Sequence, residues 1–481
     1  MRKQIFFEYF LVTLASSQVV NAALYGVPIE TEYGTVQGFK YFNGSLNFTT
    51  TNNVAAFLGV PYAADTSYQN RWKVAQPREP WNGTLMADNF GPACPIAHQA
   101  TAGFTLSEDC LSSYGSGETS GEALYDGGGL ATKDVVVISY NYRDAAFGFL
   151  VHPELSQESG HNSSGNYGIL DQLTALQWIK KNIANFGGDP DKIVIGGQSF
   201  GSAQVYHAVN SPLFKGSFRG MIAESGIRYP GDPYLAGLAD SYKTLAVAEK
   251  TGINYTAFHN VSSVAGLRNL SMESLLIGSD DRDYSISNLT ALWTSYPPLY
   301  KTCLDGYVVP STYQNSLLNG PSSDVPMITG NNKDESGAAT TTNYTVAQYY
   351  EYNTANDWYG AASSPFYTYY WDYAPPGQSG GAHHMAEINY VLNNLYKTDL
   401  PWGAYDYELA DIMSTYWANF IKYLDPNGLS NGTNSSLTQW APNEGLDDKT
   451  VMLLGTGFGM VDIEESRLDL LTEYFNSLPA Y

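Results

Sequence analysis

The sequence IVIGGQSFG, residues 193–201, decides the fold of this chain. Its first three residues, Ile193 to Ile195, predict a short buried strand, and residues 200–209 predict a helix. Ser199 stands at the turn between them, with a glycine two residues away on either side. Such glycines let the strand and the helix pack closely, while the strained turn exposes the serine hydroxyl. The stretch therefore indicates a nucleophilic serine.

Apolar runs and helical patterns alternate on both sides of this turn. Strands are predicted at residues 134–141, 221–223, 327–329 and 366–371, and a helix is predicted at residues 169–183. Strands that alternate with helices favour a mostly parallel sheet that is covered on both faces. We therefore expect the α/β class, with one central sheet flanked by helices.

A serine hydroxyl is a poor nucleophile without a base, so a histidine must lie near Ser199 in the fold. In nucleophile-elbow enzymes the serine, the acid and the histidine follow one another in that order along the chain. Of the seven histidines, only His259, His383 and His384 lie far enough downstream to leave room for an acid. The last two follow the strand predicted at residues 366–371.

The acid is expected at the end of an earlier strand. The strand at residues 327–329 leads into a loop that carries both Asp334 and Glu335. The residue pattern alone therefore leaves two candidates for the acid, and it does not choose between His383 and His384 as the base.

The amino terminus has the pattern of a signal peptide. Arg2 and Lys3 precede an apolar core at residues 5–15, and small or apolar residues end at Ala22. The apolar run is too short to span a bilayer. We expect residues 1–22 to be removed, residues 23–481 to form one domain, and the protein to be secreted without stable membrane insertion.

Composition and short motifs indicate which kinds of binding partner and covalent modification to expect. The chain has 24 Lys and Arg against 47 Asp and Glu, a net charge of −23, which argues against binding nucleic acid. Eleven Asn-x-Ser/Thr sites predict N-linked glycans on the surface of a secreted protein. Secretion also favours a disulfide between Cys94 and Cys110, leaving Cys303 as a buried thiol. No cluster has metal-ligand spacing, and we expect no metal or other cofactor.

The chain resembles the type-B carboxylesterase family, and within it secreted fungal carboxylesterases most. The resemblance covers nearly the whole mature chain. Its motifs include residues 34–38 (GTVQG), 57–63 (FLGVPYA), 90–95 (FGPACP), 107–111 (SEDCL), 165–172 (GNYGILDQ), 186–190 (FGGDP) and the turn at Ser199. The family has the α/β-hydrolase fold, which we therefore expect here.

The resemblance implies which residues form the catalytic triad. The family's D-E-G segment places the acid on Glu335, and its G-x-x-H-x-x-E segment places the base on His384. Ser225 matches a serine that supports the triad from behind. No cofactor is needed by this chemistry.

The resemblance also implies structural pairs. It matches the Cys94–Cys110 bridge and two buried ion pairs, Arg71–Glu108 and Arg143–Asp171. We expect these four charges to be structural.

The chain departs from the family after Leu111. The family continues there into two strands, the second of which ends in a glycine-rich oxyanion loop. Here residues 112–121 (SSYGSGETSG) follow at once, and no apolar strand precedes the glycines. We expect a sheet that lacks one or two strands after Leu111, with an oxyanion hole made by backbone N–H groups of Ser116, Gly117 and Phe200.

These observations predict a secreted hydrolase of small-molecule or lipid carboxylic esters, acting through an acyl-enzyme on Ser199. The alternative is a catalytically impaired or inactive carboxylesterase-like binding protein, because the strand before the oxyanion loop is missing.

Overall fold

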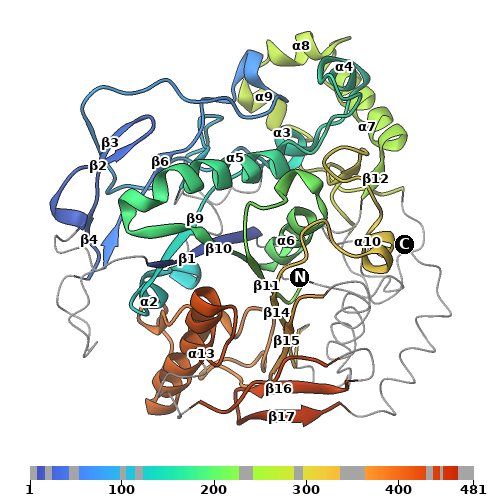
Figure 1. Ribbon diagram of the computed structural model, residues 1–481. Coiled ribbons are helices and arrows are strands. Elements are labelled where there is room, and N and C mark those ends of the chain that lie inside the picture. The colour runs from blue at the N-terminus through green and yellow to red at the C-terminus, as the bar shows by residue number, and fades with distance from the viewer. Residues whose placement is uncertain are drawn as a thin grey trace.

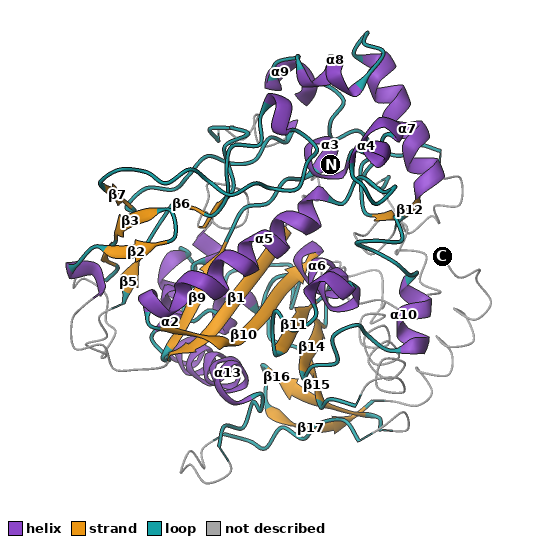
Figure 2. Cartoon of the chain, turned by 45° about the horizontal axis from the view of Figure 1, so that its top comes forward, coloured by secondary structure: helices purple, strands orange, loops and turns teal. Residues whose placement is uncertain are grey.

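Eight strands form the central sheet, in the order β17-β16-β15-β14-β11-β10-β1-β9 (Figures 1 and 2). The computed structural model describes residues 8–16, 24–42, 54–97, 104–113, 123–226, 242–285, 296–335, 363–429, 437–444 and 448–463. The sheet strands are β1 (Glu8–Ser16), β9 (Val135–Ser139), β10 (Gly188–Ser199), β11 (Gly220–Glu224), β14 (Met327–Asn332), β15 (Phe366–Trp371), β16 (Thr450–Leu454) and β17 (Phe458–Asp462).

Parallel pairing joins the five strands from β10 to β16 that carry the candidate site. Antiparallel pairs lie only at the two ends of the sheet, where β17 follows β16 and where β1 lies between β10 and β9. The expected α/β-hydrolase sheet, mostly parallel and flanked by helices, is thus confirmed.

Helices cover both faces of the sheet. Helices α5 (Tyr167–Asn182) and α6 (Phe200–Asn210) lie on one face, and α13 (Ala404–Tyr423) lies on the other (Figures 1 and 2). The remaining helices are α2 (Gly128–Ala131), α3 (Ala145–Phe149), α4 (Pro153–Glu158), α7 (Leu245–Phe258), α8 (Val264–Arg268), α9 (Met272–Leu276), α10 (Tyr313–Asn319) and α12 (Ile388–Val391). Short strands form small outer sheets, namely β2 (Ile29–Thr31), β3 (Gly34–Gln37), β4 (Phe39–Lys40), β5 (Ala55–Ala56), β6 (Val60–Pro61), β7 (Thr84–Met86), β8 (Ser112–Ser113), β12 (Lys243–Thr244) and β13 (Cys303–Leu304).

Alternation along the nucleophile strand divides the core into two layers. Ile193 and Ile195 belong to the core shared with α5 and α6, whereas Val194 belongs to the core shared with α13. Successive strand residues point to opposite faces, so a strand covered on both sides must be apolar throughout. This is why the short run at residues 193–195 is apolar without interruption.

The segment after Leu111 supplies no strand to the central sheet within the described residues. The described part of this segment contains only strand β8, which pairs with β6 outside the main sheet. The place between β9 and β10 is taken instead by β1, which consists of residues predicted to belong to the signal peptide.

The covalent prediction is confirmed: Cys94 and Cys110 form a disulfide, and Cys303 is a buried free thiol. None of the helices that the structure describes is long and apolar enough to cross a membrane.

Candidate active site

Ser199 ends strand β10 and caps helix α6 in a strained conformation. Its backbone has φ 58° and ψ −120°, a left-handed region that side-chain-bearing residues rarely adopt. Gly226 packs directly beneath the turn, since a Cβ there would come within 2.4 Å of the Ser199 carbonyl oxygen. The turn has the geometry of a nucleophile elbow. The expectation that it exposes the serine is not met, because Ser199 is only 7% exposed.

His384 and Glu335 meet at this turn from two different loops. Glu335 follows β14 and His384 follows β15, and Nδ1 of His384 is hydrogen-bonded to Oε2 of Glu335. The other carboxylate oxygen, Oε1, accepts the Asn332 backbone N–H at 2.9 Å. The carboxylate is therefore fixed at both ends and holds the imidazole in one orientation.

The competing residues at each position have other partners. Asp334 accepts the Ala382 backbone N–H at 2.8 Å, and its own N–H donates to the Ala382 carbonyl at 2.9 Å. The His383 ring lies 3.2 Å from the Gly381 carbonyl. Asp334 thus ties the histidine loop to β14, and of the two acid–histidine combinations the structure brings together Glu335 and His384. The third histidine, His259, ends helix α7, and its ring packs against Tyr255 and Phe258.

Electrostatics keep Glu335 ionised. Burial is the largest effect and raises the pKa of this carboxyl, but the lowering effects together outweigh it, led by the charge and the hydrogen bond of the nearby His384 ring. The Asn332 N–H and the Ser225 hydroxyl add smaller contributions in the same direction. The pKa of Glu335 lies below its usual value, so the group is a carboxylate able to stabilise a protonated imidazole.

Gln198 is a site residue that the sequence pattern did not single out. Its Nε2 lies 3.2 Å from Nε2 of His384 and 3.4 Å from Nδ1. Because Gln198 directly precedes Ser199, this contact places the imidazole at the nucleophile turn. The sequence could have pointed to Gln198 only through its position directly before Ser199 in the motif.

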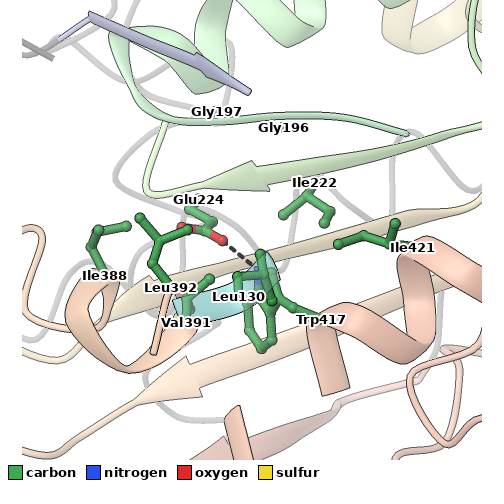
Figure 3. Close-up of a pocket in the computed structure, with 10 residues that line it drawn as sticks. All are labelled: Leu130, Gly196, Gly197, Ile222, Glu224, Ile388, Val391, Leu392, Trp417 and Ile421. Carbon is green, nitrogen blue, oxygen red and sulfur yellow. Dashed lines mark hydrogen bonds between the residues drawn. The ribbon is translucent and has the colours of Figure 1, made fainter. Parts of the chain in front are cut away.

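Two further carboxyls, Glu224 and Glu387, are buried in this region. Glu224 ends β11 and accepts the Trp417 indole N–H at 2.6 Å, as Figure 3 shows. Glu387 is hydrogen-bonded through Oε2 to Nδ2 of Asn332. Burial raises the pKa of both groups, and for Glu387 the neighbouring carboxyls Glu224 and Glu335 raise it further.

A small, mainly apolar cavity lies next to Glu224. It is lined by Leu130, Gly196, Gly197, Ile222, Glu224, Ile388, Val391, Leu392, Trp417 and Ile421 (Figure 3). Neither Ser199 nor His384 lines it, so a molecule bound there would not be in contact with these two residues. Among the described residues no group of His, Cys, Asp and Glu side chains could hold a metal ion.

The remaining predicted site residues are only partly described. Phe200 is the first residue of α6, where the N–H groups of a helix have no partner within the helix. Ser225 has φ 52° and donates its backbone N–H to the Gly330 carbonyl at 2.9 Å, directly below the acid loop. Ser116 and Gly117 lie outside the described residues.

Both expected ion pairs are formed and buried. Arg71 and Glu108 approach to 2.7 Å, and Arg143 and Asp171 approach to 2.6 Å. Arg71 also donates to backbone carbonyls near α8, including Leu270 at 2.6 Å. These charges are thus paired with each other, as expected for structural ion pairs.

The sequence matches a family model described as "Carboxylesterase family" over residues 27–112, 113–353 and 340–468. The chain belongs to the carboxylesterase family. The match is divided between residues 112 and 113, one residue after Leu111. Carboxylic ester hydrolysis is therefore the activity class of its relatives, and the predicted family is confirmed; the closeness to fungal members remains a prediction.

Three comparisons illustrate the relationship. The chain is 29% identical to a fumonisin B1 esterase of Sphingopyxis macrogoltabida over 82% of each chain. It is 30% identical to a para-nitrobenzyl esterase of Bacillus subtilis, over 64% of this chain and 62% of the relative. A solved structure titled PNB esterase superposes with a TM-score of 0.72 over 92% of this chain and 99% of that one, at 23% identity, which supports the shared fold.

Proposed function

We propose that this carboxylesterase-family protein hydrolyses carboxylic esters through an acyl-enzyme on Ser199. The observation that carries the proposal is the His384–Glu335 hydrogen bond at the strained turn that ends in Ser199. A serine, an imidazole and an orienting carboxylate are the groups that this reaction requires.

In the proposed reaction each group has one task. Nε2 of His384 takes the hydroxyl proton as Ser199 Oγ bonds to the ester carbonyl carbon. Glu335 stabilises the imidazolium, and backbone N–H groups of Phe200, Ser116 and Gly117 bind the oxyanion. The imidazolium then protonates the leaving alcohol, and a water attacks the acyl-enzyme, releases the carboxylic acid and restores Ser199.

Small-molecule or lipid esters are the proposed substrates. Relatives named after para-nitrobenzyl and fumonisin B1 esters support a small-molecule substrate. Turnover of p-nitrophenyl acetate by the purified chain, compared with its Ser199→Ala variant, tests the proposal. Hydrolysis that disappears in the variant supports it, and equal rates for the two proteins would refute it.

We also propose that the protein is secreted and carries N-linked glycans. Five of the eleven predicted sites lie on described residues, and all five are exposed: Asn82, Asn162, Asn254, Asn260 and Asn269. The Cys94–Cys110 disulfide is typical of an oxidising compartment. Glycopeptide mapping after expression in a host with a secretory pathway tests this; unmodified asparagines at all five positions would contradict it.

The second candidate is a catalytically impaired family member that binds esters without turning them over. The observation that favours it is the absence, among the described residues, of a central strand contributed by the segment after Leu111. In that case p-nitrophenyl acetate would bind to the protein without being hydrolysed by it. The wild type and the Ser199→Ala variant would then release product at the same rate, that of the uncatalysed reaction.

A further inference from the structure

Among the described residues, strand β1 is the only element that pairs with both β9 and β10 in the central sheet. It pairs with β10 from Glu8 opposite Ser199 to Leu14 opposite Ile193. On its other side it pairs with β9 from Leu11 opposite Ser139 to Ala15 opposite Val135. Figures 1 and 2 show β1 between these two strands. Among the described strands, β9 reaches the sheet only through β1.

Removing β1 would expose both neighbouring strands. The central part of β10 and the inner edge of β9 would lose their hydrogen-bonding partners, and unpaired buried backbone groups are strongly unfavourable. Helices α6 and α13 pack against β1 from opposite faces, so water could not easily replace it. The fold therefore has a binding slot for one extended peptide segment.

We propose that residues 8–16 bind in this slot as part of the folded chain, and that they replace the strand which the segment after Leu111 no longer supplies. The apolar segment that predicts a signal peptide thus has a second role as a sheet strand. Cleavage after Ala22, which the sequence pattern predicts, would take this strand away and separate β9 from the nucleophile strand. The proposal therefore requires residues 8–16 to stay in the folded protein, and it replaces the expectation that residues 1–22 are removed.

The direction of β1 distinguishes it from the strand it replaces. A strand that leads into an oxyanion loop must end beside Ser199 and so run parallel to β10. Strand β1 runs antiparallel, and its first residue, Glu8, is the partner of Ser199. It can restore the hydrogen-bond ladder without restoring the connection to residues 112–121.

A cysteine pair tests the register in the full-length chain. Thr13 and Val194 are Cα partners, and antiparallel partners lie about 4.5–5.5 Å apart, within disulfide range. We expect Thr13→Cys with Val194→Cys to form an internal cross-link on mild oxidation. The matched control pairs Thr13→Cys with Ile195→Cys, because positions 13 and 195 lie on opposite faces of the sheet.

Peptide mapping without reduction shows whether the two cysteines of each variant are cross-linked. A cross-linked peptide within one chain, absent from the control, supports the proposal. Equal yields in both variants, or a cross-link found only between two copies of the chain, would overturn it.

The second measurement is the amino terminus of the folded, purified protein and its unfolding midpoint. We expect the folded fraction to retain residues 8–16. We also expect a chain beginning at Ala23 to unfold at a lower temperature and to be restabilised by a synthetic peptide of residues 8–16. A chain beginning at Ala23 that matches the full-length protein in unfolding midpoint and ester hydrolysis would contradict the proposal.

Discussion

Gln198 Nε2 lies 3.2 Å from His384 Nε2, the ring nitrogen that receives the Ser199 proton in the proposed reaction. Gln198 is fully buried, and its Oε1 has no hydrogen-bond partner among the described residues. Its partner across the sheet is Glu224, a buried carboxyl. A neutral amide thus contacts the imidazole and is the sheet neighbour of a buried carboxyl.

Replacing this amide by a carboxylate should shift the pH dependence of catalysis. In Gln198→Glu the added negative charge favours the protonated imidazole, so a higher pH is needed to free the base. We expect the acidic limb of the kcat/KM profile to move up by about one pH unit. Gln198→Met, which adds no charge, is the control. An unchanged limb in Gln198→Glu would mean that position 198 does not influence the base.

The two neighbouring acids should differ sharply in their effect on turnover. Glu335→Gln leaves the imidazole without its orienting charge and should lower kcat by roughly 10⁴-fold, the scale seen for this change in serine triads. Asp334→Asn disturbs only the contact with the Ala382 N–H and should affect mainly the unfolding temperature. Steady-state kcat values for both variants test which residue is the acid. A larger loss of kcat in Asp334→Asn than in Glu335→Gln would reverse the assignment.

The buried carboxyls should make stability depend on pH. The folded-state pKa of Glu387 is raised by burial and by Glu224 and Glu335 from an ordinary value of 4.5. Between that value and the raised pKa the folded state keeps a proton that the unfolded chain has lost. Stability therefore falls as pH rises through this window, by about 1.4 kcal/mol for each unit of the raised pKa.

Glu387→Gln removes this titration. We expect its unfolding midpoint to change less between about pH 5 and about pH 8 than that of the wild type, because a neutral amide cannot gain charge on unfolding. Glu335 has a lowered pKa and loses its contribution only at more acidic pH, so it does not obscure the comparison. Parallel slopes for the two proteins would show that Glu387 does not titrate in this range.

The central strands and helices could be predicted because each has its own apolar run or helical spacing within a short stretch of sequence. The strand at residues 366–371 was placed at its observed bounds, and the helix at 200–209 ends one residue short of α6. The strand at 327–329 was predicted too short, because its continuation to Asn332 consists of polar residues that the sheet and the acid loop bury. An apolar pattern cannot signal a strand end whose burial depends on tertiary contacts.

The choice between neighbouring residues needed information beyond the local pattern. Residue spacing could not separate Asp334 from Glu335, because the choice depends on which carboxylate meets a loop 49 residues away. The sequence pattern did not predict strand β1 either. Its apolar residues fit a signal peptide as well as a buried strand, and the pairing with β9 and β10 bridges more than 100 residues of sequence.

If the proposed reaction takes place, the oxyanion hole should limit its rate. Among the described residues, the segment after Leu111 contributes no strand to the central sheet, and β1 runs antiparallel to β10 and does not lead into residues 112–121. Losing one oxyanion donor costs about 100- to 1000-fold in kcat. We therefore expect lower turnover than in relatives that have the strand, and recovery when the two strands of a relative are inserted after Leu111. Equal turnover before and after insertion would contradict this.

The most direct test of the account is covalent labelling of Ser199. A fluorophosphonate ester reacts with a serine only when a base activates the hydroxyl. We expect peptide mass spectrometry to find one adduct, on the peptide that contains Ser199, and no adduct in the Ser199→Ala or His384→Ala variants. An ester-hydrolysing preparation in which Ser199 stays unmodified, or in which another serine such as Ser225 carries the adduct, would contradict the central claim.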